Sequence, residues 1–167
     1  MISLTELNQI SQEDFVKTLG EVFEDTPAIA YQVWYERPFQ DVTELYQKMV
    51  NIVRDYSQEK QLKLIQAHPD LGSKAKMAVA SVQEQAGAGL DRLTPEEYDR
   101  FLSLNQAYKN KFDFPFIVAV KNHTKDSILA AFEQRLQNSL KIEQNKALEE
   151  IFQIAKFRLD AMITDDG

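Results

Sequence analysis

The chain has 167 residues, of which 44% are hydrophobic and 27% are charged, so its length and composition fit one globular domain with a sizeable core. It contains no cysteine, which excludes disulfides, thiolate nucleophiles and cysteine-based metal sites and fits a cytoplasmic protein. The net charge of -7 argues against nucleic acid as a partner, and because no apolar run is long enough to span a bilayer we expect no membrane contact.

The hydrophobic spacing is helical along nearly the whole chain. In the first half it predicts helices that begin after Ser11, Thr26 and Asp41, because each of these side chains can cap the free N–H groups of a helix. A fourth helix is predicted from about residue 57 to residue 67. It must end near His68, since the residue before a proline is pushed out of the α-helical region.

The second half continues this pattern with one interruption. Helices are predicted at 73–86, after Thr94, after Thr124, and at about 139–163. The interruption lies at 112–120, where aromatic and β-branched residues surround a proline, which predicts a short buried extended segment. The sequence therefore predicts an all-α fold, a single compact domain over residues 1–167 with about eight helices and one extended segment near 113–120.

His68 is one of only two histidines, and it directly precedes a proline in the stretch His68-Pro69-Asp70-Leu71-Gly72. One interpretation is a plain turn in which His68 only ends a helix, because proline fixes φ and glycine permits a positive φ. The other is a catalytic histidine on a rigid junction, where a side chain that titrates near neutral pH suits acid–base chemistry. Spacing alone leaves both interpretations open.

The stretch from Ser81 to Gln85 raises a similar choice. On a helix, Ser81, Glu84 and Gln85 lie three and four residues apart and form one polar stripe. The stripe could face solvent, but the small or apolar neighbours, among them Met77 and Ala78, indicate close packing. Buried polar groups need partners, and a small polar ligand would supply them.

The segment from Phe114 to Val120 is typical of a core, but it also offers a binding surface. An extended segment among helices leaves N–H and C=O groups that neighbouring turns do not pair. A flat heterocycle rich in the same groups could pair with them.

Three further side chains are considered as ligand-binding residues. Arg135 and Arg158 lie on otherwise apolar helices and could bind a carboxylate, although their positions alone favour surface residues whose charged ends reach solvent. His123 lies in a polar loop and is expected at the surface. With two distant histidines and no cysteine, the sequence gives little support for a transition-metal site.

Taken together, four stretches resemble the 2-oxo-4-hydroxy-4-carboxy-5-ureidoimidazoline (OHCU) decarboxylase family of urate breakdown. They are "HPDLG" at 68–72, "SVQEQAGAGL" at 81–90, "NQAYKNKFDFPFIVAV" at 105–120, and "RLQNS" through "IAKFRL" between 135 and 159. The resemblance implies an all-α, cofactor-free enzyme that converts OHCU to (S)-allantoin and carbon dioxide, the last step from urate to allantoin. It also implies a homodimer. Asp113 stands where many members have glycine, and because aspartate tolerates unusual φ values we expect the turn to survive.

Matched motif by motif, the resemblance implies that His68 is the catalytic histidine and Glu84 the essential carboxylate, with no metal. It implies a substrate-binding set that consists of Pro69, Ser81, Val82, Gln83, Gln85, Phe116, Ile117, Val118, Ala119, Val120 and Arg158.

The residue types fit the implied chemistry. Loss of carbon dioxide leaves an electron pair that a conjugated C=N of the substrate ring can accept, so no cofactor is expected. On this hypothesis His68 hydrogen-bonds the hydroxyl and carboxylate at the reacting carbon, and Glu84 holds ring or ureido N–H groups and shuttles a proton. Arg158 pairs with an anionic or carbonyl oxygen.

Two other functions stay open from the sequence. A non-catalytic helical ligand-binding or scaffold module would not need His68 or Glu84. A decarboxylase or hydrolase of a related ureido heterocycle would use the same side chains on a different small molecule.

Overall fold

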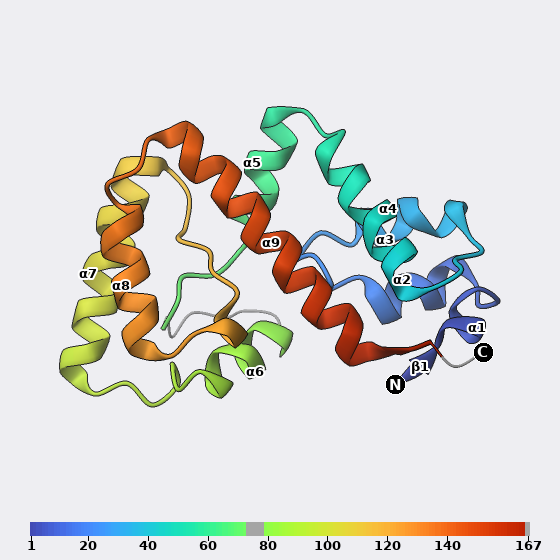
Figure 1. The fold of residues 1–167 in the computed structure, drawn as a ribbon, viewed down its shortest axis with the longest axis horizontal. Helices are drawn as coiled ribbons and strands as arrows, with labels where there is room; N and C mark the ends of the chain where they lie inside the picture. The colour runs from blue at the N-terminus through green and yellow to red at the C-terminus, as the bar shows by residue number, and fades with distance from the viewer. Residues whose placement is uncertain (73–78, 166–167) are drawn as a thin grey trace. The chain divides into compact units, whose positions relative to one another are not determined.

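The computed structural model describes residues 1–72 and 79–165, and it is mostly α-helical (Figure 1). Within these ranges there are nine α-helices, two short 3₁₀ helices and two strands of two residues each. The all-α prediction is therefore confirmed. The chain divides into two compact units, one of residues 1–64 together with the chain beyond residue 151, and one of residues 65–151. They are called the N-terminal unit and the central unit below.

The N-terminal unit is built from short helices. Its elements are β1 (Ile2–Ser3), α1 (Leu4–Leu7), α2 (Gln12–Leu19), α3 (Ala28–Val33), the 3₁₀ helix η1 (Trp34–Glu36), α4 (Val42–Arg54), most of α5 (Gln58–Gln66), the end of α9 (Leu140–Met162) and β2 (Ile163–Thr164). Helix α3 packs against α2 and α4. Strands β1 and β2 pair in parallel, with Ile2 opposite Ile163.

The predicted caps of this unit are confirmed in two of three cases. Ser11 accepts the N–H of Asp14 at 3.1 Å, and Asp41 accepts the N–H of Glu44 at 2.7 Å. The cap predicted at Thr26 is wrong, because its hydroxyl donates to the backbone carbonyl of Glu24 at 2.8 Å. Helix α3 begins one residue after Pro27 without a side-chain cap.

The central unit contains α7, which is the longest described helix that lies wholly within one unit. Its elements are α6 (Val79–Gly87), α7 (Pro95–Phe112), the 3₁₀ helix η2 (Val120–Asn122), α8 (Lys125–Arg135) and the first half of α9. Helices α7 and α8 lie side by side in Figure 1, and α6 packs against η2. Thr94 and Thr124 both form reciprocal capping boxes at the starts of α7 and α8, as their sequence positions predict. The start of the helix predicted at 73–86 lies outside the described residues, as do Met77 and Ala78.

The predicted extended segment is confirmed as a buried stretch of backbone. All residues from 114 to 120 are buried, and none of the described strands includes them. Aromatic contacts hold the segment, since Phe116 stacks on Phe132 with ring centroids 3.8 Å apart and meets Tyr108 edge-on at 5.3 Å. The segment therefore crosses the interior of the central unit and brings its backbone close to α6 through η2.

No helix within residues 1–72 and 79–165 combines the length and apolar character that a membrane span requires.

Asp113 ends α7 in the left-handed conformation, with φ of 65° and ψ of 24°. Replacing Asp113 by glycine removes the steric cost of this conformation and an acidic charge at the negative end of the helix dipole, so the free energy of unfolding should rise by about 0.5 kcal/mol. Asp113→Ala should lower it by about 1 kcal/mol. Urea unfolding of the three proteins measures both changes, and a glycine variant less stable than the parent would contradict this account.

Candidate active site

The turn at 68–72 follows α5 directly and is fixed in shape by its glycine. The N–H of His68 donates to the carbonyl of Ile65 at 3.2 Å, which closes the end of the helix. Gly72 has a φ of +71°, and a Cβ there would lie 2.9 Å from a methyl carbon of Leu93. The backbone conformation therefore favours glycine at this position. The positive φ expected for Gly72 is confirmed, and the His68 side chain at the start of the turn is buried, with 8% exposure.

Three contacts tie this turn to the helices around it. The N–H of Gly72 donates to the side-chain oxygen of Gln85 on α6 at 3.0 Å. The side-chain amide of Asn105 on α7 donates to the carbonyl of Leu71 at 2.9 Å. Asp70 pairs with Lys109 at 3.2 Å, also on α7. The turn that carries His68 is therefore held on two sides within the central unit.

His68 lines a cavity of about 240 Å³. The other lining residues are Gln66, Asp70, Lys109, Asp113, Phe114 and Pro115. Two of the lining residues are joined by a hydrogen bond from the Gln66 side chain to the carbonyl of Asp113 at 3.0 Å. Its size suits a small polar molecule, and its walls come from the turn, from α7 and from the start of the extended segment.

The polar stripe of α6 is partly buried. Ser81 is 5% exposed and Gln85 is 7% exposed, while Glu84 is half-buried. The intervening Val82 and Gln83 have exposed side chains, with 50% exposure for Val82. The stripe therefore does not lie wholly on a solvated face. The Gln85 oxygen is already engaged by Gly72, which gives this residue a structural task in addition to its predicted one.

The predicted substrate-contacting backbone lies in the buried segment from Phe116 to Val120. The carbonyl of Ile117 accepts a hydrogen bond from Nη1 of Arg135 at 2.6 Å, and the N–H of Ala119 donates to Oε1 of Glu150 at 3.3 Å. The carbonyl of Ala119 accepts the N–H of Asn122 at 3.0 Å, which begins η2. Several of the backbone groups that the sequence leaves unassigned thus have partners inside the protein.

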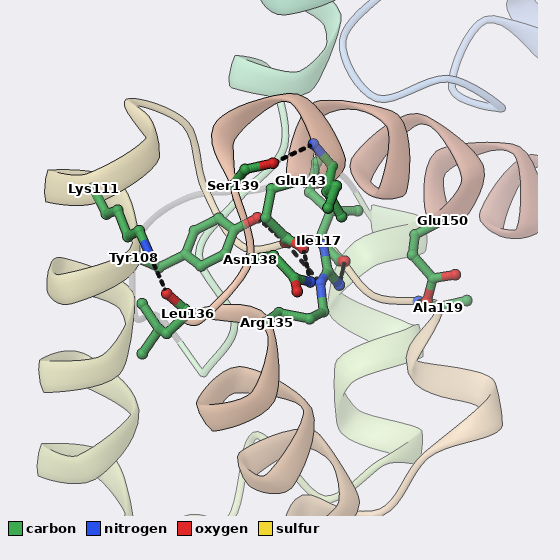
Figure 2. Close-up of polar contacts among 11 residues, drawn as sticks. Tyr108, Lys111, Ile117, Ala119, Arg135, Leu136, Asn138, Ser139, Glu143 and Glu150 are labelled. Atoms are coloured by element: carbon green, nitrogen blue, oxygen red, sulfur yellow. Dashed lines mark hydrogen bonds and ion pairs between the residues drawn. The ribbon is translucent and has the colours of Figure 1, made fainter.

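Arg135 is the centre of a buried polar network that the sequence did not predict (Figure 2). The expectation of a surface position is wrong, because Arg135 is 5% exposed and its Nε donates to Oε1 of Glu143 at 2.8 Å. The same carboxylate, which is fully buried, accepts the hydroxyl of Tyr108 at 2.5 Å and the side-chain amide of Asn138 at 2.8 Å. The spacing of apolar residues on α8 does not indicate that Arg135 is buried, because its partner Glu143 lies on the next helix, α9.

The Tyr108 hydroxyl stays a proton donor in this network. Burial, together with the hydrogen bond to Glu143, raises the pKa of Tyr108 above its usual value of 10.0. A phenol that remains protonated at all physiological pH values keeps the hydrogen bond to the carboxylate in place.

Arg158 belongs to the N-terminal unit, and the expectation of a surface side chain is wrong for it as well. It is 5% exposed, its guanidinium faces the buried carboxylate of Glu24 at 3.6 Å, and Nη1 donates to the carbonyl of Glu21 at 2.8 Å. A buried arginine of this kind can bind oxygen atoms strongly. Its assignment as a substrate ligand stays a prediction.

His123 is half-buried, and its ring nitrogen Nδ1 lies 2.9 Å from the hydroxyl of Ser127. The described residues contain no group of three or more histidine, aspartate or glutamate side chains placed to hold a metal ion.

Comparison with known proteins points to one family. A sequence profile described as OHCU decarboxylase matches residues 8–160. The chain is 45% identical to a 2-oxo-4-hydroxy-4-carboxy-5-ureidoimidazoline decarboxylase of Halalkalicoccus jeotgali, over 99% of this chain and 95% of that protein. It is 42% identical to the enzyme of the same name from Haloferax volcanii, over 95% and 94%. Among solved structures, the crystal structure of an (S)-allantoin synthase matches 97% of this chain and 54% of that one, with a TM-score of 0.79 and 30% identity.

The raised pKa of Tyr108 predicts a pH-dependent effect of removing its hydroxyl. At pH 7, Tyr108→Phe should lower the free energy of unfolding by about 1 kcal/mol, because Glu143 loses one buried hydrogen bond. Above pH 10 the Tyr108 phenol ionises in the unfolded wild-type chain but not in the folded one. The free energy of unfolding of the wild type should therefore fall by about 1.4 kcal/mol per pH unit from this group, whereas the variant, which lacks the phenol, should not show this fall.

The difference in free energy of unfolding between the wild type and Tyr108→Phe should therefore shrink as the pH rises and vanish near pH 11. Urea unfolding at pH 7, 10 and 11 measures it, and the other tyrosines titrate equally in both proteins. A difference that stays constant across this range would contradict the assigned pKa direction.

Proposed function

The chain belongs to the OHCU decarboxylase family, and we propose that His68 and Glu84 form the catalytic pair of its active site. The activity is that of a carboxy-lyase, the decarboxylation of OHCU to (S)-allantoin and carbon dioxide in urate degradation. The observation that supports the pair most directly is the hydrogen bond between Gly72 and Gln85, at 3.0 Å. It joins the turn that carries His68 to the helix residue next to Glu84.

The proposed role of His68 follows from its surroundings. It is 8% exposed, lies on a turn fixed by Gly72, and opens on a cavity of about 240 Å³. A histidine held in this way has little freedom to rotate away from a bound substrate. We assign it the hydrogen bonds to the hydroxyl and carboxylate at the reacting carbon, where it helps convert the hydroxyl to a carbonyl as carbon dioxide leaves.

Glu84 has the complementary role. A half-buried carboxylate on α6 can accept hydrogen bonds from the N–H groups of a ureidoimidazoline, which a neutral side chain would do less strongly. It thereby fixes the orientation of the ring, and it can return a proton to one face of the carbanion equivalent. A proton delivered to one face only would explain a single enantiomer of the product.

The remaining ligands form the outer part of the proposal. Ser81, Gln85 and the backbone of 116–120 are assigned the amide-like edges of the substrate, and Arg158 an anionic or carbonyl oxygen. Pro69, Val82 and Gln83 complete the predicted contacts. A homodimer and a cytoplasmic location stay predictions, the first from the family resemblance and the second from the lack of cysteine.

Replacing either member of the pair should abolish stereoselective product formation. We expect His68→Asn and Glu84→Gln each to lower kcat/KM by about 100-fold or more, the size of a general acid–base contribution. The matched control is His123→Asn, which removes the other histidine of the chain.

Circular dichroism measures the outcome when urate oxidase and hydroxyisourate hydrolase generate the substrate in the presence of each protein. The wild type and the control should accumulate optically active (S)-allantoin, and the two variants should leave slow, racemic formation. Wild-type rates in either variant would refute the proposed pair, and racemic product with the wild type would favour a non-catalytic binding module.

A further inference from the structure

The buried segment 116–120 is held from α8 and α9 at two backbone groups close together in the chain (Figure 2). Nη1 of Arg135 donates to the carbonyl of Ile117 at 2.6 Å. Oε1 of Glu150 accepts the N–H of Ala119 at 3.3 Å. Two charged side chains of opposite sign therefore fix the peptide groups on either side of Val118.

The first of these groups, the Arg135 guanidinium, is itself bound by two partners. Glu143 and the Ile117 carbonyl engage two nitrogens of the Arg135 guanidinium, whose central carbon lies 4.4 Å from the ring centroid of Phe116. Glu143 is fixed in turn by Tyr108 and Asn138. Because each partner is held by another, the position of the Ile117 carbonyl is set by a network and not by one flexible side chain.

A network of this kind is a costly way to gain stability alone. Removing two charges from water offsets most of their attraction, and well-packed apolar residues often stabilise a core equally well. The Arg135–Glu143 pair sits among aromatic rings that already pack the segment, including Phe116 stacked on Phe132. What the charged groups add is directional control of individual backbone atoms, since a hydrogen bond has a preferred angle and a van der Waals contact does not.

Val118 lies between the Ile117 carbonyl and the Ala119 N–H, and its own backbone groups explain why their positions need to be controlled. It is 4% exposed, and neither its N–H nor its C=O is hydrogen-bonded to any described residue. A buried backbone N–H or C=O without a partner is costly unless a ligand completes it. The amide edge of a ureidoimidazoline carries both a donor and an acceptor, which the C=O and the N–H of Val118 could bind.

We propose that Arg135 and Glu150 are positioning residues, which hold the backbone at 117–119 so that the peptide groups of Val118 meet the amide edge of the substrate. The proposal rests on the function proposed above. Neither side chain is assigned a contact with the reacting atoms. Their effect is to keep the substrate-binding backbone in its competent geometry before the substrate arrives.

Glu150 offers the sharper test, because it is only half-buried and its removal leaves the Arg135–Glu143 pair intact. Glu150→Ala should raise KM about tenfold, as expected for one lost hydrogen bond to a charged group, and should change kcat by less than about twofold. Glu150→Gln keeps an acceptor for the Ala119 N–H and should recover most of the wild-type KM. Glu149→Ala, an exposed neighbour on α9, is the matched control and should behave as wild type.

Separate measurement of KM and kcat distinguishes a positioning role from a general loss of structure. A variant that merely unfolds in part lowers the apparent kcat at constant KM, because fewer molecules are active. Amide hydrogen exchange of ligand-free protein gives an independent reading, since the Ala119 N–H should exchange faster in Glu150→Ala than in the wild type and the control.

A wild-type KM in Glu150→Ala, or a loss confined to kcat, would overturn the inference. Failure of the proposed function looks different, because only slow, racemic allantoin would then form in the presence of the wild type. Arg135→Lys extends the test to the other holding group, with the same expected rise in KM in whatever fraction of the protein folds.

Discussion

A single buried hydrogen bond, from the N–H of Gly72 to the side-chain oxygen of Gln85, is the constraint on which the proposed active site depends. It connects the turn after α5 to α6. Gly72 donates this bond from a backbone with a φ of +71°, a conformation that favours glycine. His68 stands four residues before this bond and Glu84 one residue before Gln85, so one contact sets both catalytic candidates in the same unit.

The backbone that faces α6 is controlled in a different way. Residues 116–119 precede η2 and belong to none of the described helices or strands, so side chains must set much of the geometry of this segment. Aromatic packing by Phe116, Phe132 and Tyr108 fills the space, and the Arg135 network with Glu150 fixes individual backbone atoms. The central unit thus combines a rigid turn, a half-buried carboxylate and a directed peptide segment.

Much of this architecture could be predicted from the sequence because its signals are local. The caps at Ser11, Asp41, Thr94 and Thr124 depend on residues three positions apart, and the proline after His68 ends a helix by sterics alone. The extended segment was recognisable because a proline interrupts a run of aromatic and β-branched residues. Spacing alone left His68 and Glu84 open between a structural and a catalytic interpretation, and only the resemblance of their motifs to one family singled them out.

Features that depend on distant partners could not be predicted in this way. The sequence around Arg135 is typical of a surface residue, because its partner Glu143 lies on the following helix. Arg158 likewise pairs with Glu24, which lies far from it in the sequence. The parallel pair β1–β2 joins the two ends of the described chain through two residues each, too short for any alternating pattern. Thr26 occupies a position typical of a helix cap, but its hydroxyl donates to the nearby carbonyl of Glu24. Residue preferences do not decide between these two local hydrogen bonds.

The most direct test of the central claim is a crystal structure of the protein with bound (S)-allantoin. The account predicts a ligand that contacts the His68 side chain and the Glu84 carboxylate, with its amide edge against the peptide groups of Val118. Product bound elsewhere, with neither His68 nor Glu84 within hydrogen-bond distance, would contradict it.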